Sequence, residues 1–336
     1  MRISFKEFML SGAICSLNAD EILIGWGIKT WAEEPLSYPA WYAPDFFLLT
    51  PKPFLHFSHT KRINNKELQF LKSVKLKIPF FLPEWSFFEN LFKDFKQQKL
   101  EKMVPYVQKK AQFTISPLSY LKNCLIYKEN HPLTAIYGFW DQTEGLLGVT
   151  PELLLSLKSG TLKTVACAGT CSTSKTDCML KDLKLFKEHQ LVIEGIQHSL
   201  QPFGKLSVGS TEMKSFSNLK HLITPIEVRG VNGDFKEIVA ALHPTPALGT
   251  FPRKKDCDVL KNYAISVPRG RFGAPFGVLE AKDHALLHVA IRNIQWQNDT
   301  VTMTAGCGIV AESKLEIEKQ EINEKFKAIH EILGIL

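Results

Sequence analysis

The sequence predicts an α+β fold: antiparallel β-sheets packed with helices in one intertwined domain. Strand-like segments follow one another as hairpins and do not alternate with crossover helices, which favours antiparallel over parallel sheets. Amphipathic segments of helical period lie between the hairpins. The 336 residues contain no internal repeat and no low-complexity linker that would separate domains.

The first half of the chain predicts short strands and one helix. Residues 1–60 form β-like or irregular pieces rich in Trp, Tyr and Pro, and residues 61–98 are basic and aromatic. A helical pattern runs over about 89–102. Four strand-like segments follow, at 134–140, 146–149, 153–157 and 162–168.

The second half predicts three helices, a strand region and a hairpin. Helices are expected over 176–200 and over Phe235–Leu242, the latter ending before Pro244. Strand-like residues occupy 221–228. The closing elements are a hairpin of 286–296 and 301–305, turned at 297–299, and a terminal helix over about 314–333.

Composition argues against several classes of protein. A hydrophobic content of 45% and a charged content of 22% are typical of a globular protein with a large core, and no apolar run could span a bilayer. The net charge of +7 is dispersed, so we expect no nucleic-acid partner. The seven cysteines lack CxxC spacing, which favours reduced thiols and a cytoplasmic location. No heptad run is visible, so we expect a monomer.

The C-terminal part combines a glycine-containing turn with a helix that carries two acids. Glu318, Glu321 and Lys325 lie three and four residues apart, which places them on one helical face. The turn at 305–310 precedes them, and Arg292 lies upstream in an alternating stretch. This pattern predicts a site for an anion and a hard metal cation, because Mg²⁺ binds one or two carboxylates plus substrate oxygens. The ordinary alternative is a solvated helix face.

Six further segments concentrate glycine, proline and ionisable residues at expected strand ends. They are 148–152, 168–170, 188–189, 220–224, 243–249 and 269–273. Each alone is typical of a turn or a loop. In this order, together with the C-terminal block, they resemble the chorismate-binding enzyme family, which holds isochorismate synthases, salicylate synthases and the large subunits of anthranilate and aminodeoxychorismate synthases. The resemblance makes residues 99–336 the chorismate-binding catalytic region, and residues 1–98 match weakly as the N-terminal part of the fold.

The resemblance implies chorismate as substrate and Mg²⁺ as cofactor. Glu188 and Glu321 match the two magnesium carboxylates, and Glu318 lies one helical turn before Glu321. His221 matches a pocket histidine near the reacting ring, with a purely structural histidine as the alternative. The positions that match substrate contacts are Ala168, Gly169, Thr170, Ala247, Phe272, Ile291, Arg292, Gly306, Cys307, Gly308 and Lys325.

Lys102 and Glu152 match the catalytic base and acid of isochorismate and salicylate synthases. Lys102 would activate water for addition at C2 of the ring, and Glu152 would protonate the departing C4 hydroxyl. Both roles require pKa values close to neutrality, lowered for the lysine and raised for the glutamate. An exposed lysine with an ordinary pKa would be a poor base.

Four positions favour isochorismate synthase over its sister activities. Ala168 replaces the nucleophilic lysine common in aminodeoxychorismate synthases. Ala247, Phe272 and Ile291 stand where amino-transferring and salicylate-forming relatives tend to have threonine, tyrosine and another aliphatic residue. The resemblance therefore implies reversible conversion of chorismate to isochorismate, in a menaquinone, siderophore or salicylate pathway.

Two alternatives stay open. Salicylate synthase uses the same acid and base, and would also release pyruvate. A catalytically weak chorismate-binding relative is the second alternative, motivated by three departures from the family pattern: Val107 and the segment 171–173 lack expected arginines, and Thr250 replaces a glycine.

Overall fold

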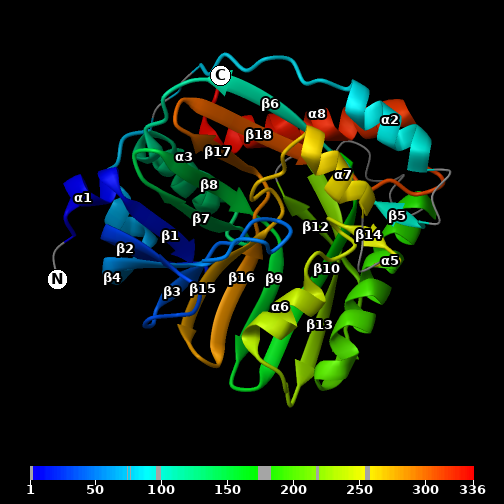
Figure 1. The fold of residues 1–336 in the computed structure, drawn as a ribbon, viewed down its shortest axis with the longest axis horizontal. Helices are drawn as coiled ribbons and strands as arrows, with labels where there is room; N and C mark the ends of the chain where they lie inside the picture. The colour runs from blue at the N-terminus through cyan, green and yellow to red at the C-terminus, as the bar shows by residue number, and fades with distance from the viewer. Residues whose placement is uncertain are drawn as a thin grey trace.

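The computed structural model describes residues 3–73, 75, 77–95, 100–172, 183–216, 219–253 and 258–336. Within these ranges, sixteen strands form one continuous sheet and two short strands pair separately. Every pairing between these strands is antiparallel. The predicted α+β class with antiparallel sheets is therefore confirmed (Figure 1).

The elements follow the chain in an order rich in hairpins. The first half contains α1 (Phe5–Leu10), β1 (Gly12–Ser16), β2 (Glu21–Ala32), β3 (Ala40–Tyr42), β4 (Phe54–Asn64), η1 (Asn65–Leu68), α2 (Ser86–Phe95), β5 (Lys102–Met103), β6 (Tyr106–Gln112), α3 (Pro117–Asn130), β7 (Ala135–Trp140), β8 (Glu144–Thr150), β9 (Leu153–Lys158) and β10 (Thr161–Ser172). The second half contains α5 (Leu183–Leu200), η3 (Gln201–Phe203), β11 (Lys205–Val208), β12 (Glu212–Phe216), β13 (Leu219–Arg229), α6 (Phe235–Leu242), β14 (Thr250–Phe251), α7 (Asp258–Ser266), β15 (Pro275–Ala281), β16 (His284–Val289), β17 (Asn293–Gln297), β18 (Thr300–Gly306) and α8 (Leu315–Leu333).

The N-terminal strands lie in the middle of the sheet. The strand order is β11-β13-β10-β9-β16-β15-β3-β4-β2-β1-β7-β8-β17-β18-β6, with β12 paired to β13 outside this path. Strand β3 pairs with β15, and β1 pairs with β7. The first 64 residues therefore join two halves of one sheet, as the blue strands of Figure 1 show.

Helices cover the two halves of the sheet and give each its own core. On one half, α3 and α8 pack against each other and against β8, and Phe326 of α8 lies in their common hydrophobic cluster. On the other half, α5 contacts α6, β10 and β13, and Ile196 and Val239 lie in a second cluster. Ile291 packs against both clusters, which places its segment at the junction of the halves.

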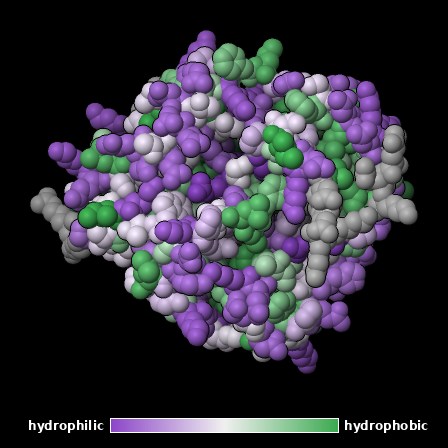
Figure 2. Space-filling view, viewed as in Figure 1, coloured by the Kyte–Doolittle hydropathy of each residue, from purple (hydrophilic) through white to green (hydrophobic). Residues whose placement is uncertain are grey.

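The outer surface has the polarity expected of a globular chain. Figure 2 shows a face of mainly hydrophilic side chains in which apolar residues form small, separate groups. Large apolar side chains such as Trp26, Trp41 and Trp140 are completely buried. None of the helices in the described ranges has the length and hydropathy needed to cross a bilayer.

Several sequence predictions hold to within a residue or two. The helix α6 has the predicted bounds, and its start is fixed by a capping box between Asp234 and Glu237. The terminal helix α8 begins one residue after the predicted start and ends before Gly334, whose φ of 65° suits glycine. The predicted helix 176–200 is described from Leu183 onward as α5, and its first seven predicted residues lie outside the described ranges.

Two predicted elements are wrong. The helix 89–102 does not extend to Lys102, because Lys102 lies in strand β5, which pairs with β14, and α2 is described over Ser86–Phe95. The strand 286–296 is two strands, since β16 pairs with β15 and β9 whereas β17 pairs with β8 and β18. Arg292 interrupts the extended run with a φ of 57°, in the left-handed region.

Candidate active site

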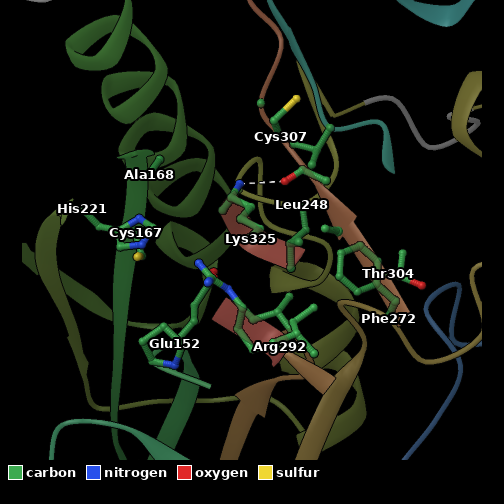
Figure 3. Close-up of a pocket in the computed structure, with 18 of the residues that line it drawn as sticks. Glu152, Cys167, Ala168, His221, Leu248, Phe272, Arg292, Thr304, Cys307 and Lys325 are labelled. Atoms are coloured by element: carbon green, nitrogen blue, oxygen red, sulfur yellow. Dashed lines mark hydrogen bonds between the residues drawn. The ribbon is translucent and has the colours of Figure 1, made fainter. Parts of the chain in front are cut away.

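A cavity of about 70 Å³ lies where the two halves of the sheet meet (Figure 3). Both halves contribute to its lining, which includes Ala168 of β10 from one half and Gly306 of β18 from the other. A larger cavity of about 550 Å³ lies beside α6, and the described residues that line it include no carboxylate. The predicted site residues that line the smaller cavity are Glu152, Ala168, Glu188, His221, Ala247, Phe272, Ile291, Arg292, Gly306, Cys307, Gly308 and Lys325.

Arg292 reaches the cavity because of the break between β16 and β17. Its backbone turns at this residue, and Asn293 stabilises the turn by donating a side-chain hydrogen bond to the Ala290 carbonyl oxygen at 2.7 Å. Figure 3 shows the Arg292 side chain among the cavity residues. The guanidinium is buried, which lowers its pKa, and the group can offer two parallel donors to a carboxylate.

Glu152 is a buried acid immediately before β9. Burial raises the pKa of its carboxyl group to about 7, against the opposing influence of Lys102, Lys325 and Arg292. A carboxyl group with this pKa is protonated in about half of the molecules at neutral pH. It can therefore donate a proton to a bound molecule under physiological conditions.

Lys102 is completely buried beneath the cavity. Its ammonium donates to the Pro246 carbonyl oxygen at 2.6 Å and lies 3.4 Å from Oε1 of Glu188. Burial lowers the pKa of Lys102, and the nearby ammonium groups of Lys325 and Lys184 act in the same direction, whereas Glu188 opposes them. The amine is thus more easily deprotonated than that of an exposed lysine.

The Ala168–Gly169 backbone approaches the cavity through an irregularity in β10. Its pairing with β13 shifts register between Ala168 and Thr170, and Gly169 has a φ of 69°. A Cβ at Gly169 would lie 2.9 Å from the Leu185 carbonyl oxygen, so this position requires glycine. The side chain of Thr170 lies outside what the structure describes. His221 of β13 lies opposite Thr170 of β10 and is buried. Burial lowers the pKa of its imidazole well below the ordinary value, so the ring is neutral.

The turn after β18 forms the opposite wall. Lys325 of α8 donates to the Gly306 carbonyl oxygen at 2.7 Å, which is the contact drawn in Figure 3. A Cβ at Gly308 would lie 2.0 Å from Oε1 of Glu188 and 2.9 Å from Nζ of Lys102. Glycine at 308 therefore allows the proposed base and a proposed metal carboxylate to lie together under the turn.

Three carboxylates from α5 and α8 each pair with a lysine. Glu188 pairs with Lys102, Glu321 pairs with Lys325 at 2.8 Å, and Glu318 pairs with Lys184 at 2.8 Å. Burial raises the pKa of Glu318, whereas Lys325 and Lys184 overcome the effect of burial and lower the pKa of Glu321.

The carboxylate oxygens of Glu188, Glu318 and Glu321 are ligands that suit a hard divalent cation. Because residue 308 has no side chain, the Glu188 carboxylate fits against it. In this arrangement, however, the described part of the chain holds no group of three His, Cys, Asp or Glu side chains close enough to share a metal ion. The carboxylates would have to turn from their lysines to do so.

Sequence reasoning missed several residues of the site. Lys184 was the most important of these, although it lies four residues before Glu188 and hence on the same face of α5. The missed lining residues are neighbours of predicted ones or apolar wall residues, namely Val104, Pro151, Cys167, Leu248, Thr304, Ala305 and Ile329. Of the predicted site residues that the structure describes in full, four are not among those that line the cavity, namely Lys102, Gly169, Glu318 and Glu321. Lys102 and Glu321 pair with the lining residues Glu188 and Lys325, and Gly169 follows the lining residue Ala168.

Two curated proteins resemble this chain in sequence. The salicylate biosynthesis isochorismate synthase of Pseudomonas aeruginosa is 31% identical over 201 residues, which are 56% of this chain and 42% of that protein. The isochorismate synthase MenF of Bacillus subtilis is 30% identical over 213 residues, which are 59% of this chain and 45% of that protein. The matched region thus spans less than half the length of either relative.

A solved structure and a family model extend the comparison. The menaquinone-specific isochorismate synthase MenF from Escherichia coli has the same fold, with a TM-score of 0.76 at 18% identity over 97% of this chain and 89% of that chain. The family model described as chorismate binding enzyme matches residues 83–334, which contain every predicted site residue. The chain belongs to the chorismate-binding enzyme family.

Proposed function

We propose that the chain is a Mg²⁺-dependent isochorismate synthase, which interconverts chorismate and isochorismate. The observation that carries the proposal is the pair of opposite pKa shifts beside one cavity: burial raises the pKa of Glu152 to about 7 and lowers that of Lys102. A base and an acid poised in this way suit the addition of water together with the loss of a hydroxyl group. The names of the two curated relatives support the same activity.

The cationic groups of the cavity give chorismate its orientation. Chorismate carries two carboxylates, and Arg292 and Lys325 both line the space into which it would fit. The glutamates 188, 318 and 321 would hold Mg²⁺, which would supply charge neutralisation for a substrate carboxylate. Phe272 and Ile291 provide an apolar wall that excludes bulk water from the ring.

The proton transfers follow from the two shifted groups. Neutral Lys102 takes a proton from water as its oxygen bonds to C2 of the ring. The two ring double bonds move one position each, and the C4–oxygen bond breaks. Glu152 donates its proton to that oxygen, which leaves as water, so the sum is an isomerisation. His221 stays neutral at the cavity wall because burial lowers its pKa, and it adds no charge near the ring.

The proposal includes a monomeric enzyme in the cytoplasm. The described cysteines at 15, 124, 167 and 307 are free and buried, which is compatible with a reducing compartment. The Bacillus subtilis relative is named MenF, and the Escherichia coli MenF is described as menaquinone-specific, so we propose menaquinone biosynthesis as the destination of the product.

Product analysis tests the proposal directly. The purified chain is incubated with chorismate and Mg²⁺, and the products are resolved by chromatography, with parallel reactions containing EDTA or ammonium. We expect isochorismate in equilibrium with chorismate, and its loss in EDTA. Stoichiometric pyruvate with salicylate would instead identify a salicylate synthase, and anthranilate with ammonium would identify an anthranilate synthase. Binding of chorismate without any product would identify a non-catalytic relative.

A further inference from the structure

Lys184 bridges the two helices that carry the carboxylates. It lies in the first turn of α5, and its ammonium is 2.8 Å from Oε1 of Glu318 on α8. The Glu318 side chain is completely buried, and that of Lys184 is 14% exposed. A buried carboxylate requires a charged partner, because an unpaired one would lose its hydration without compensation.

The charge of Lys184 interacts with all three carboxylates. Burial alone would lower its pKa, yet Glu321, Glu188 and Glu318 together raise the pKa above the ordinary value of a lysine. The other two lysines of the cluster are also held by the backbone, since Lys102 donates to Pro246 and Lys325 donates to Gly306. Lys184 thus contacts Glu318 directly, and its charge also acts on Glu188 and Glu321.

We propose that Lys184 is an internal counter-cation that holds the Glu318 carboxylate in the metal-free protein and competes with the divalent cation for it. This inference rests on the proposed metal-dependent function. Together with the pairs of Lys102 with Glu188 and of Lys325 with Glu321, it explains how three acids stay together between α5 and α8 without a metal. A metal ion that binds to Glu318 must replace the ammonium of Lys184, so the lysine lowers the affinity for metal.

The matched test compares Lys184→Met with Lys187→Met. Both changes remove a lysine from α5, but Lys187 pairs with Glu312 at the surface, where both side chains are 44% exposed. Mn²⁺ serves as the probe, because it accepts the same oxygen ligands and its free form is counted by electron paramagnetic resonance. Binding is measured without chorismate, and thermal unfolding is measured in EDTA.

The proposal expects opposite effects on metal binding and on metal-free stability. Lys184→Met should lower the Kd for Mn²⁺ at least about tenfold, because a competing charge is removed. The same variant should unfold at a lower temperature in EDTA, because Glu318 loses its partner. Lys187→Met should leave both measurements unchanged, because surface ion pairs contribute little.

Other results would overturn the proposal. A Kd that is unchanged in Lys184→Met, or higher than in the wild type, would show that Lys184 does not compete with the metal. If Lys184→Met does not fold, Lys184→Arg keeps the charge with a stronger carboxylate partner, and we expect it to raise the Kd; an unchanged or lower Kd would refute the competition. Absence of Mn²⁺ binding by the wild type, with isochorismate still formed in EDTA, would overturn the metal dependence of the proposed function as well.

Discussion

The ammonium of Lys102 lies 3.4 Å from Oε1 of Glu188, and both side chains are buried. The two residues come from β5 and α5, elements that meet only in the folded chain. Burial lowers the pKa of Lys102, and the negative charge of Glu188 opposes that effect. The protonation of the proposed base therefore depends on how strongly the Glu188 carboxylate interacts with other cations.

Replacement of Lys102 tests the base directly. Lys102→Met keeps the length and apolar stem of the side chain and removes the amine. We expect isochorismate formation to fall by about 10²-fold or more, because general-base catalysis contributes a factor of this size. Chorismate binding, measured by calorimetry, should remain. Lys122→Met, which changes a partly exposed lysine of α3, is the control, and full activity in Lys102→Met would remove the residue from the mechanism.

Gly308→Ala tests whether the turn must leave room for the Glu188 carboxylate and the Lys102 amine. The added Cβ would lie 2.0 Å from Oε1 of Glu188, which has to move by more than 1 Å. A displacement of this size at a reacting group can cost about 10²-fold in rate, and we expect a loss of that order. Gly209→Ala is a suitable control, since the atom nearest to its Cβ would be one of Pro225 at 3.2 Å. Equal activities of the two variants would contradict the prediction.

The local sequence pattern predicts those elements whose stability is mainly local or periodic. Helix α6 has its own capping box, and α8 has an amphipathic repeat and a glycine end, so both could be placed from the sequence. The acid Glu152 and the site segments could be named because the family resemblance orders them. Their placement around one cavity agrees with that expectation, and their roles stay predictions.

Long-range contacts determine the features that local patterns could not predict. Lys102 lies in a two-residue strand that exists only because it pairs with Phe251 of β14. Arg292 leaves the extended conformation where the chain passes between two distant parts of the sheet. Lys184 forms its ion pair with Glu318, a residue on another helix, so the residues around Lys184 in the sequence do not predict this contact. The N-terminal strands were expected to be weakly matched pieces, and they prove to join the halves of the sheet.

Arg292→Lys separates the shape of the cation from its charge. Lysine keeps the positive charge but lacks the planar pair of donors that suits a carboxylate. The loss of one hydrogen bond to a charged group, about 1.5–3 kcal/mol, corresponds to a rise of roughly 10- to 150-fold in KM. We expect kcat to change less than KM in steady-state kinetics. Arg62→Lys, at a surface ion pair with Glu280, is the control. An unchanged KM would place the substrate carboxylate elsewhere.

The pH dependence of folding stability tests the environment of Glu152. Burial raises the pKa of this carboxyl group in the folded protein from 4.5 to about 7. A raised pKa means that the folded state prefers the protonated form, so its contribution to stability is fully present below about pH 4.5 and is lost as the pH rises to about 7. The loss amounts to about 3 kcal/mol, since one pKa unit corresponds to about 1.4 kcal/mol.

Glu152→Gln removes this ionisation while it keeps the size of the side chain. Urea unfolding of the variant and the wild type should give free energies whose difference shifts in favour of the variant as the pH rises from about 4.5 to about 7. Titrating groups that do not interact with Glu152 cancel in this difference. The same substitution should remove isochorismate formation at every pH, because glutamine has no acidic proton to donate. In the wild type, the rate should fall as the pH rises above about 7, because the acid is then ionised. A difference in unfolding free energy that is independent of pH would mean that Glu152 titrates like an exposed glutamate, and would remove the physical basis of its role as the acid.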